Sequence, residues 1–146
     1  MTPDLLFAIC NYGILPAWLL LVAAPRWSGT QWIVHSLFLP VLLGTVYGFV
    51  LATAPEAPAG ASFSDLRGVM SFFTVPEAAL AGWIHYLAFD LFIGAWQVRD
   101  AQRREIPHLW VVPCLVSTLM LGPVGLALYL ALRWVRTRTL LFEETA

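Results

Sequence analysis

Residues 83–100 form the sequence WIHYLAFDLFIGAWQVRD, an apolar and aromatic segment that carries His85 and Asp90 inside it and ends in a charged turn with Arg99 and Asp100. A charged side chain at the centre of a lipid-spanning helix costs roughly 2.5–3.5 kcal/mol on insertion scales, so such a residue is a functional candidate by default. The segment therefore predicts a transmembrane helix that carries part of a functional site.

The whole chain has the composition of an integral membrane protein. Of its 146 residues, 60% are hydrophobic and 12% are charged, whereas a soluble domain carries about 25% charged residues. The apolar residues gather in blocks of about 20, the length that crosses a hydrocarbon core of roughly 30 Å. The net charge of -1 includes no basic arm for phosphates, which argues against a nucleic-acid partner. We expect an all-α protein whose partner is the lipid bilayer.

A single domain, residues 1–146, is predicted to contain four transmembrane helices. Their ranges are about 5–24, 31–54, 76–97 and 108–134. Between the second and third, residues 64–73 have Ser64 as a candidate N-cap and apolar residues on one face, which predicts a short amphipathic helix lying on the membrane. A re-entrant loop is the alternative for this segment. Gly122-Pro123, inside the fourth range, predicts a kink or a break.

Four spans would place the N-terminus, the 55–75 loop and the C-terminal tail on one side of the membrane. The arginines then divide evenly between that side (Arg67, Arg133, Arg136, Arg138) and the other (Arg26, Arg99, Arg103, Arg104). The positive-inside rule therefore gives no orientation for this arrangement. The N-terminus shows no signal or transit sequence, which favours a bacterial inner (plasma) membrane.

Depth along the helices suggests a polar cluster at one end of the bundle. His35 would lie about one turn inside the second span, Asp90 about two turns inside the third, and His108 at the start of the fourth, all from the same side. This set has the composition of a two-histidine, one-carboxylate metal site. No HxxxH or HExxH spacing supports a metal, so we expect no metal and no cofactor.

The helical wheel places the two polar residues inside the segment 83–100, His85 and Asp90, on different faces of the helix. Asp90 shares a face with Trp83 and Tyr86, whereas His85 lies about 140° away at 100° per residue. Purely structural roles are alternatives to function. His85 would then bond a backbone carbonyl or Asn11, and Asp90 would form an ion pair, for instance with Arg99 or Arg104.

Residues 83–100, followed by His108 and by PCLVSTLMLGPVGLALY (113–129), resemble the abscisic-acid-deficient-four-like membrane family, also described as neoxanthin-synthase-like. The motifs W-x-H-x-L-A-x-D-L-F and G-P-x-G-L carry the resemblance, which covers about residues 76–130. Plant members of the family are required to form neoxanthin from violaxanthin. The chain departs from the plant proteins because it has no plastid transit sequence.

The resemblance implies an isomerase that opens a 5,6-epoxide of a carotenoid or another isoprenoid to an allene without redox change. This reaction needs an acid on the epoxide oxygen and a base near the carbon that loses its proton. A carboxyl group in hydrocarbon favours its neutral form and can act as the acid, and a neutral imidazole can act as the base. Asp90 and His85 are the catalytic candidates, with His108 or His35 as substitutes. The predicted substrate-binding residues, mostly aromatic side chains that would stack along a polyene, are Trp83, Tyr86, Phe89, Phe92, Trp96 and Asn11.

A second class of function remains open from the sequence. A non-catalytic membrane subunit that binds a carotenoid or lipid, or packs against a larger complex, would need the same aromatic residues. The sequence predicts neither the substrate nor the oligomeric state.

Overall fold

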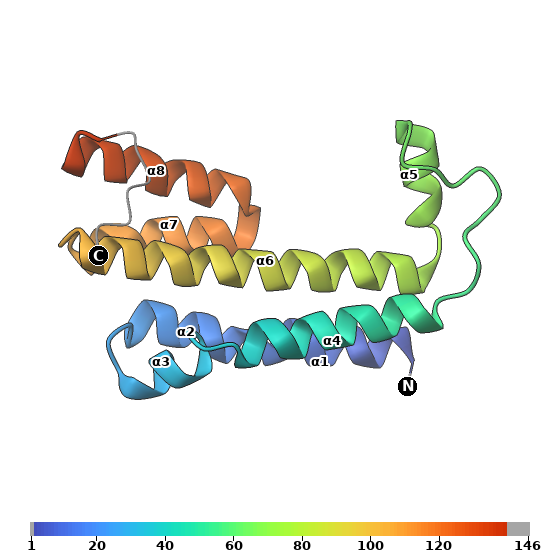
Figure 1. The fold of residues 1–146 in the computed structure, drawn as a ribbon, viewed down its shortest axis with the longest axis horizontal. Coiled ribbons are helices and arrows are strands. Elements are labelled where there is room, and N and C mark those ends of the chain that lie inside the picture. Colours follow the sequence, from blue (N-terminus) through green and yellow to red (C-terminus); the bar gives the residue numbers. More distant parts are fainter. Residues whose placement is uncertain (1, 140–146) are drawn as a thin grey trace.

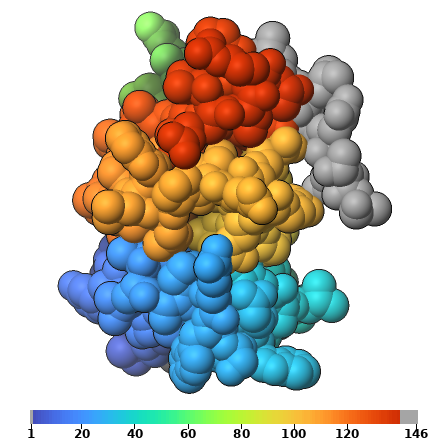
Figure 2. All heavy atoms as spheres, turned by 90° about the vertical axis from the view of Figure 1, so that its left-hand side faces the viewer, coloured from blue at the N-terminus to red at the C-terminus, as the bar shows by residue number. Residues whose placement is uncertain are grey.

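The structure is a computed structural model that describes residues 2–139, and every regular element in this range is an α-helix. The longest helix, α6, runs through the middle of the molecule, with α1–α4 on one side and α7 and α8 on the other (Figure 1). Seen from one end, these groups form stacked layers (Figure 2). The helices are α1 (Pro3–Gly13), α2 (Leu15–Ala23), α3 (Ser28–Ile33), α4 (Phe38–Thr53), α5 (Leu66–Phe72), α6 (Pro76–Arg103), α7 (His108–Leu121) and α8 (Pro123–Thr137).

Three segments within the described residues are long and apolar enough to cross a membrane, namely Pro3–Ala23, Ser28–Thr53 and Pro76–Arg103. They correspond to the first three predicted spans. The second is interrupted between α3 and α4, where the Ser36 hydroxyl accepts a hydrogen bond from the Phe38 backbone N–H. The third continues beyond the predicted end at residue 97 because its last turns are buried by neighbouring helices.

The predicted fourth span, residues 108–134, is not one continuous helix. The chain breaks at Gly122-Pro123, as the sequence indicated, but it then reverses, so that α8 runs back along α7 (Figure 1). Gly122 has φ 45° and ψ -98°, a backbone conformation that side chains with a Cβ rarely adopt. With 14 residues, α7 is about 21 Å long, shorter than a hydrocarbon core of roughly 30 Å.

Close packing of α7 against α8 requires glycine at a second position, Gly125. A Cβ added at Gly125 would lie 2.1 Å from the Thr118 backbone nitrogen and 2.2 Å from its hydroxyl oxygen. Any side chain larger than hydrogen would therefore push α8 away from α7. The G-P-x-G-L motif thus combines a turn residue, a proline in the first turn of α8 and a contact glycine.

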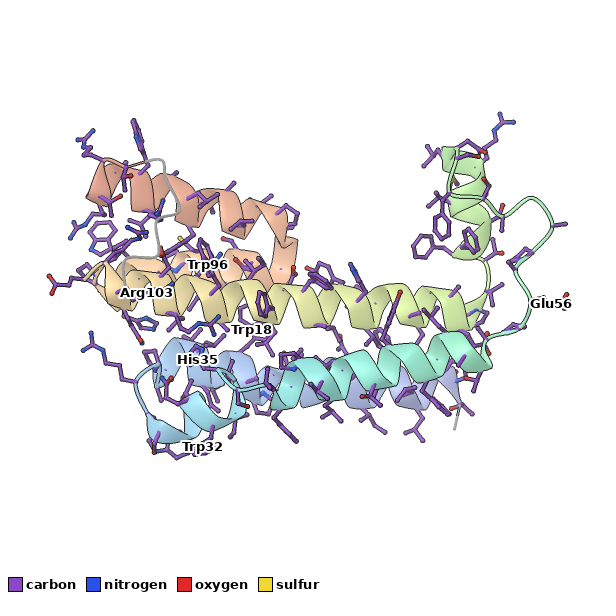
Figure 3. The ribbon with its side chains drawn as sticks, viewed as in Figure 1. Trp18, Trp32, His35, Glu56, Trp96 and Arg103 are labelled. Carbon is purple, nitrogen blue, oxygen red and sulfur yellow. The ribbon has the colours of Figure 1, made fainter. Side chains whose placement is uncertain are left out.

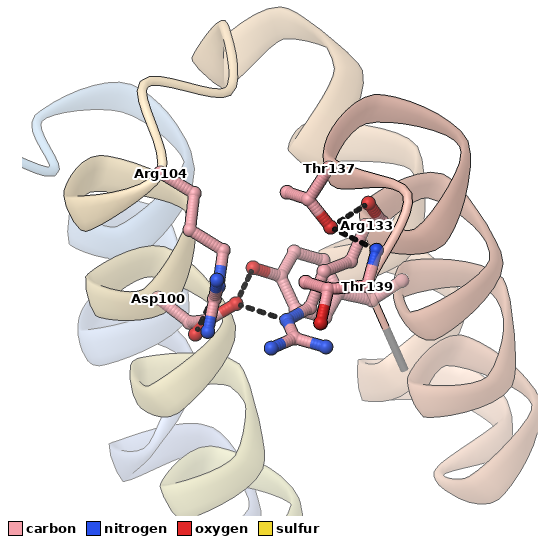
Figure 4. A network of polar contacts seen from close by, with 6 residues as sticks. Asp100, Arg104, Arg133, Thr137 and Thr139 are labelled. Carbon is pink, nitrogen blue, oxygen red and sulfur yellow. Dashed lines mark hydrogen bonds and ion pairs between the residues drawn. The ribbon is translucent and has the colours of Figure 1, made fainter. Parts of the chain in front are cut away.

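A buried ionic cluster holds the hairpin against α6. The Asp100 carboxylate accepts a hydrogen bond of 2.6 Å from the Tyr129 hydroxyl. It also forms ion pairs with Arg133 at 3.2 Å and with Arg104 at 2.9 Å (Figure 4). Asp100 is 4% exposed, Arg133 2% and Tyr129 0%. One turn earlier on α6, the Gln97 amide donates to the buried Thr118 hydroxyl on α7 at 2.9 Å.

The short helix between the second and third segments is α5, and it begins slightly later than predicted. Asp65, not Ser64, is its N-cap, and the Asp65 carboxylate accepts a hydrogen bond of 2.9 Å from the Gly68 backbone N–H. Ser64 instead pairs with Ser62. The apolar side chains Leu66 and Met70 on α5 are exposed. Its position on a membrane surface remains a prediction.

The reversal also moves the arginines, so the even division expected for four spans is wrong. The end of α8 returns to the end of the molecule that carries the α2–α3 and α6–α7 turns (Figure 1). All arginines except Arg67 therefore gather at this end, which we call the arginine end. The acidic residues Asp4, Glu56, Asp65 and Glu77 lie toward the opposite end. The positive-inside rule predicts that the arginine end faces the cytoplasm.

Single cysteines introduced into loops at the two ends of the molecule test this orientation. Ala59→Cys lies in the 54–65 loop and Glu105→Cys lies in the turn between α6 and α7, whereas the native Cys10 and Cys114 are buried. In intact bacterial cells a membrane-impermeant maleimide should label Ala59→Cys, and it should label Glu105→Cys only after permeabilisation. The reverse pattern would contradict the orientation.

Asp100→Asn should destabilise the protein by about 3–5 kcal/mol, because it leaves the buried Arg133 without its carboxylate. The measurement is the free energy of unfolding in mixed detergent micelles, followed by helical circular dichroism. Glu105→Gln is the matched control, since Glu105 is an exposed carboxylate near the same end of α6. Equal stabilities for the two variants would show that the cluster does not anchor the hairpin.

Candidate functional site

Asp90 lies at the tip of the α7–α8 hairpin. A Cβ added at Gly122 would be 3.0 Å from Asp90 Oδ1 and 3.2 Å from Oδ2, so the carboxylate faces the chain reversal directly. Asp90 Oδ2 is buried and has no hydrogen-bond partner within residues 2–139. A buried polar atom without a partner is costly. Such an atom is therefore a candidate for contact with a bound molecule.

The shared face predicted for Trp83, Tyr86 and Asp90 is confirmed by their contacts. The Tyr86 hydroxyl donates to the Leu119 backbone carbonyl at 3.4 Å and lies beside the Asp90 carboxylate. The rings of Trp83 and Tyr86 are 5.3 Å apart between centroids. Trp83 Nε1 donates to Asn11 Oδ1 at 3.1 Å, so Asn11 is a partner of Trp83 and not of His85.

Three parts of the chain border this face of α6: α1, which contacts Trp83 through Phe7 and Asn11, α5 and the hairpin. Toward the N-terminus of α6, the Phe73 ring beside α5 packs against Gly82, and toward the C-terminus the hairpin begins at the level of Asp90. Between α5 and the hairpin the ribbon of α6 has no helix above it (Figure 1), and Trp83 is 39% exposed.

An apolar groove of about 570 Å³ lies between α1–α2 and α7. Tyr12, Trp18 and Leu119 are among its lining residues, and Leu119 is also the residue whose carbonyl accepts from Tyr86. Trp18 lies below α6 in Figure 3, with its ring close to Gly94. A groove of this size with an apolar lining suits a hydrocarbon chain.

His85 points away from Asp90, as the helical wheel predicted. It is exposed, and its ring lies 4.4 Å from Phe89 and 6.3 Å from Tyr47 between centroids. No contact joins His85 to Asp90 within the described residues. Their combination as an acid and a base on one substrate remains a prediction.

The predicted cluster of His35, Asp90 and His108 does not form. His35 Nδ1 lies 3.0 Å from Arg99 Nη1, and His108 Nε2 bonds the Val22 carbonyl at 2.9 Å. No group of three histidine, cysteine or acidic residues in the described part of the chain could hold a metal ion. The common depth predicted for these residues is wrong, because Asp90 faces Gly122 after the last turn of α7 whereas His108 begins that helix, about 21 Å away along its axis.

The remaining aromatic candidates on α6 divide into two kinds. Phe89 and Phe92 are 59% and 54% exposed and point outward. Trp96 is half-buried and meets the Tyr129 ring edge-on at 5.4 Å. Trp96 therefore packs inside the hairpin interface, above α6 in Figure 3.

The partners of Asp100 are not those that the sequence indicates. The predicted third span ends at residue 97, before Asp100, and Arg104 is a predicted partner for Asp90, whereas in the structure Arg104 binds Asp100. A signal was present, because Tyr129 and Arg133 are four residues apart and so share one face of a helix. If residues 108–134 formed one span, Tyr129 and Arg133 would lie at the opposite end of the bundle from Asp100. The shared face therefore points to Asp100 only once the chain reversal is known.

Comparison with known proteins identifies the family of this chain. A family model described as ABA DEFICIENT 4-like matches residues 5–129. The relative "Protein ABA DEFICIENT 4, chloroplastic" from Arabidopsis thaliana is 26% identical over 107 residues, which cover 68% of this chain and 49% of the relative. The chain thus spans about half the length of that relative. No solved structure matches.

The family match includes Asp90, Tyr86, Gly122 and the first half of α8, so it extends over both sides of the candidate site. This chain belongs to the ABA DEFICIENT 4-like family.

Proposed function

We propose that this protein is a membrane enzyme that isomerises an epoxide on a carotenoid or another isoprenoid, with Asp90 as the group that transfers the proton. The observation that carries the proposal is the buried Asp90 Oδ2, which has no hydrogen-bond partner within residues 2–139 and lies at the hairpin tip. The resemblance to a family whose plant members act in neoxanthin formation supports the choice of an epoxide.

A single carboxyl group can complete this reaction. Protonated Asp90 donates its proton to the epoxide oxygen while one carbon–oxygen bond breaks, which leaves a hydroxyl group on one carbon and a positive charge on the other. The resulting carboxylate removes a proton from the adjoining chain carbon, and the electrons of that carbon–hydrogen bond complete the allene. Asp90 is protonated again, so the reaction consumes no other reactant.

The surroundings of Asp90 suit this role better than those of Asp100. No arginine or histidine contact to Asp90 is found among the described residues, and hydrocarbon solvates a carboxylate poorly, so the neutral, proton-donating form is favoured. Asp100 instead contacts two arginines, Arg104 and Arg133. Tyr86, fixed through its bond to the Leu119 carbonyl, positions the Asp90 side chain.

The apolar groove between α1–α2 and α7 would hold the hydrocarbon chain of the substrate. Leu119 borders the groove and its carbonyl accepts from Tyr86, so the groove leads toward the proposed reacting group. Trp83 and Tyr86 would then stack on the part of the polyene that lies nearest to Asp90.

Asp90→Asn should lower the rate of turnover of an epoxy-carotenoid by roughly 10²–10⁴-fold, because the amide can neither donate the proton nor remove it. The measurement is pigment analysis of a violaxanthin-containing host, or of purified protein incubated with the epoxide. Glu77→Gln, on the same helix but near its N-terminus, is the matched control and should retain activity. An Asp90→Asn variant that is folded and fully active would remove the proton-transfer role.

His85→Phe decides whether a second residue acts as the base. We expect turnover to persist, because the His85 ring contacts Phe89 and Tyr47 on the other side of α6. Loss of turnover with normal pigment binding would instead favour Asp90 and His85 as an acid–base pair. Wild-type protein that binds the pigment but leaves its mass and absorption unchanged would favour a non-catalytic binding subunit.

A further inference from the structure

A second cavity, of about 300 Å³, lies between the start of α4 and the C-terminal half of α6. It differs from the apolar groove because one of its ends is polar, formed by His35 and Arg99. Its other end is apolar and is formed by Leu37, Pro40, Ala88 and Phe92. The cavity is outside the Asp90 site, and the proposed reaction does not use it.

The hydrogen bond between His35 and Arg99 fixes the tautomer of the histidine. A guanidinium group can only donate, so His35 Nδ1 must accept from Arg99 Nη1, 3.0 Å away. The proton of the neutral ring is then on Nε2. Nε2 is buried and has no hydrogen-bond partner within residues 2–139. His35, a lining residue of the cavity, therefore carries a buried N–H donor that lacks an acceptor within residues 2–139, next to the Arg99 cation.

The polar end of the cavity lies at the depth of lipid headgroups. Arg99 is one turn from the end of α6 at Arg103, on the arginine end of the molecule. Phe92 and Ala88 are seven and eleven positions earlier on the same helix, which places them about 10 and 16 Å deeper at 1.5 Å per residue. The cavity thus extends from the interface into the hydrocarbon, with its polar groups outermost.

We propose that this cavity binds one anionic phospholipid from the leaflet at the arginine end. A phosphate oxygen would accept the hydrogen bond from His35 Nε2 and contact the Arg99 guanidinium, and the first part of one acyl chain would fill the space beside Pro40, Ala88 and Phe92. The charge of Arg99 selects an anionic over a zwitterionic lipid. The apolar end of the cavity selects a lipid over a free phosphate, which would leave that end empty.

The orientation predicted above agrees with this occupant. The positive-inside rule places the arginine end at the cytoplasmic leaflet, where anionic lipids concentrate. The proposal does not depend on the isomerase activity, because the two sites share no residue.

The experiment measures the melting temperature of the purified full chain in a neutral maltoside detergent, together with native mass spectrometry of the lipid adduct. The probes are phosphatidylglycerol, phosphatidylcholine and glycerol 3-phosphate, each added alone. Phosphatidylglycerol should raise the melting temperature and leave a bound mass, whereas the other two should do neither. Equal stabilisation by phosphatidylcholine, or by glycerol 3-phosphate, would overturn the proposal.

Three variants separate the cavity from general surface charge. Arg99→Gln removes the cation, and Ala88→Phe fills the apolar end without altering either polar group. Both should lose the stabilisation by phosphatidylglycerol. Arg136→Gln, an exposed arginine at the same end, is the matched control and should keep it.

If Arg136→Gln weakened the response as much as Arg99→Gln, binding would be to the charged surface and the proposal would fail. Ala88→Phe keeps the test decisive if Arg99→Gln does not fold. If phosphatidylglycerol stabilised Ala88→Phe as much as the wild type, that result would also contradict the proposal. Each variant is first compared with the wild type for its melting temperature without lipid.

Discussion

The reversal of the chain at Gly122 is the constraint on which the rest of the structure depends. A residue with a Cβ would meet the Asp90 carboxylate and would be strained at the positive φ of this position. Glycine permits the turn, and Gly125 then permits α8 to lie against α7. Because the hairpin is shorter than α6, it covers only the C-terminal half of that helix and ends at the level of Asp90.

Two acidic residues of α6, Asp100 and Asp90, contact the hairpin in opposite environments. Asp100 anchors the hairpin to α6, whereas Asp90 belongs to the candidate site. Asp100, near the open end of the hairpin, has ion pairs with Arg104 and Arg133 and a bond from Tyr129. Those contacts satisfy the carboxylate, so it serves to hold the helices together. Asp90, at the tip, has a buried oxygen without a hydrogen-bond partner in the described part of the chain. The hairpin thus supplies partners to the Asp100 carboxylate and none to Asp90 Oδ2.

Hydropathy was sufficient to predict three of the spans, and the helical wheel predicted that Asp90 and His85 face apart. The hairpin could not be predicted, because Gly122-Pro123 is compatible with either a kink or a reversal, and the total length of residues 108–134 suits a complete span. Every error about orientation and about the partners of Asp100 follows from that ambiguity. The predicted cluster of histidines failed for another reason. Because α6 continues to Arg103, Asp90 lies deeper than expected and faces the end of α7 that is opposite His108. His35 and His108 meanwhile bond Arg99 and the Val22 carbonyl.

The most direct test is the distance between spin labels on Leu109→Cys and Trp134→Cys, both at exposed positions, measured by pulsed electron resonance in lipid nanodiscs. In a hairpin the two positions lie on neighbouring helices whose axes are about 8–10 Å apart, so a narrow distribution at short distance is predicted. One continuous helix would separate them by about 38 Å at 1.5 Å per residue. A single population near that longer distance would contradict the hairpin, and with it the placement of Asp90 at a closed tip.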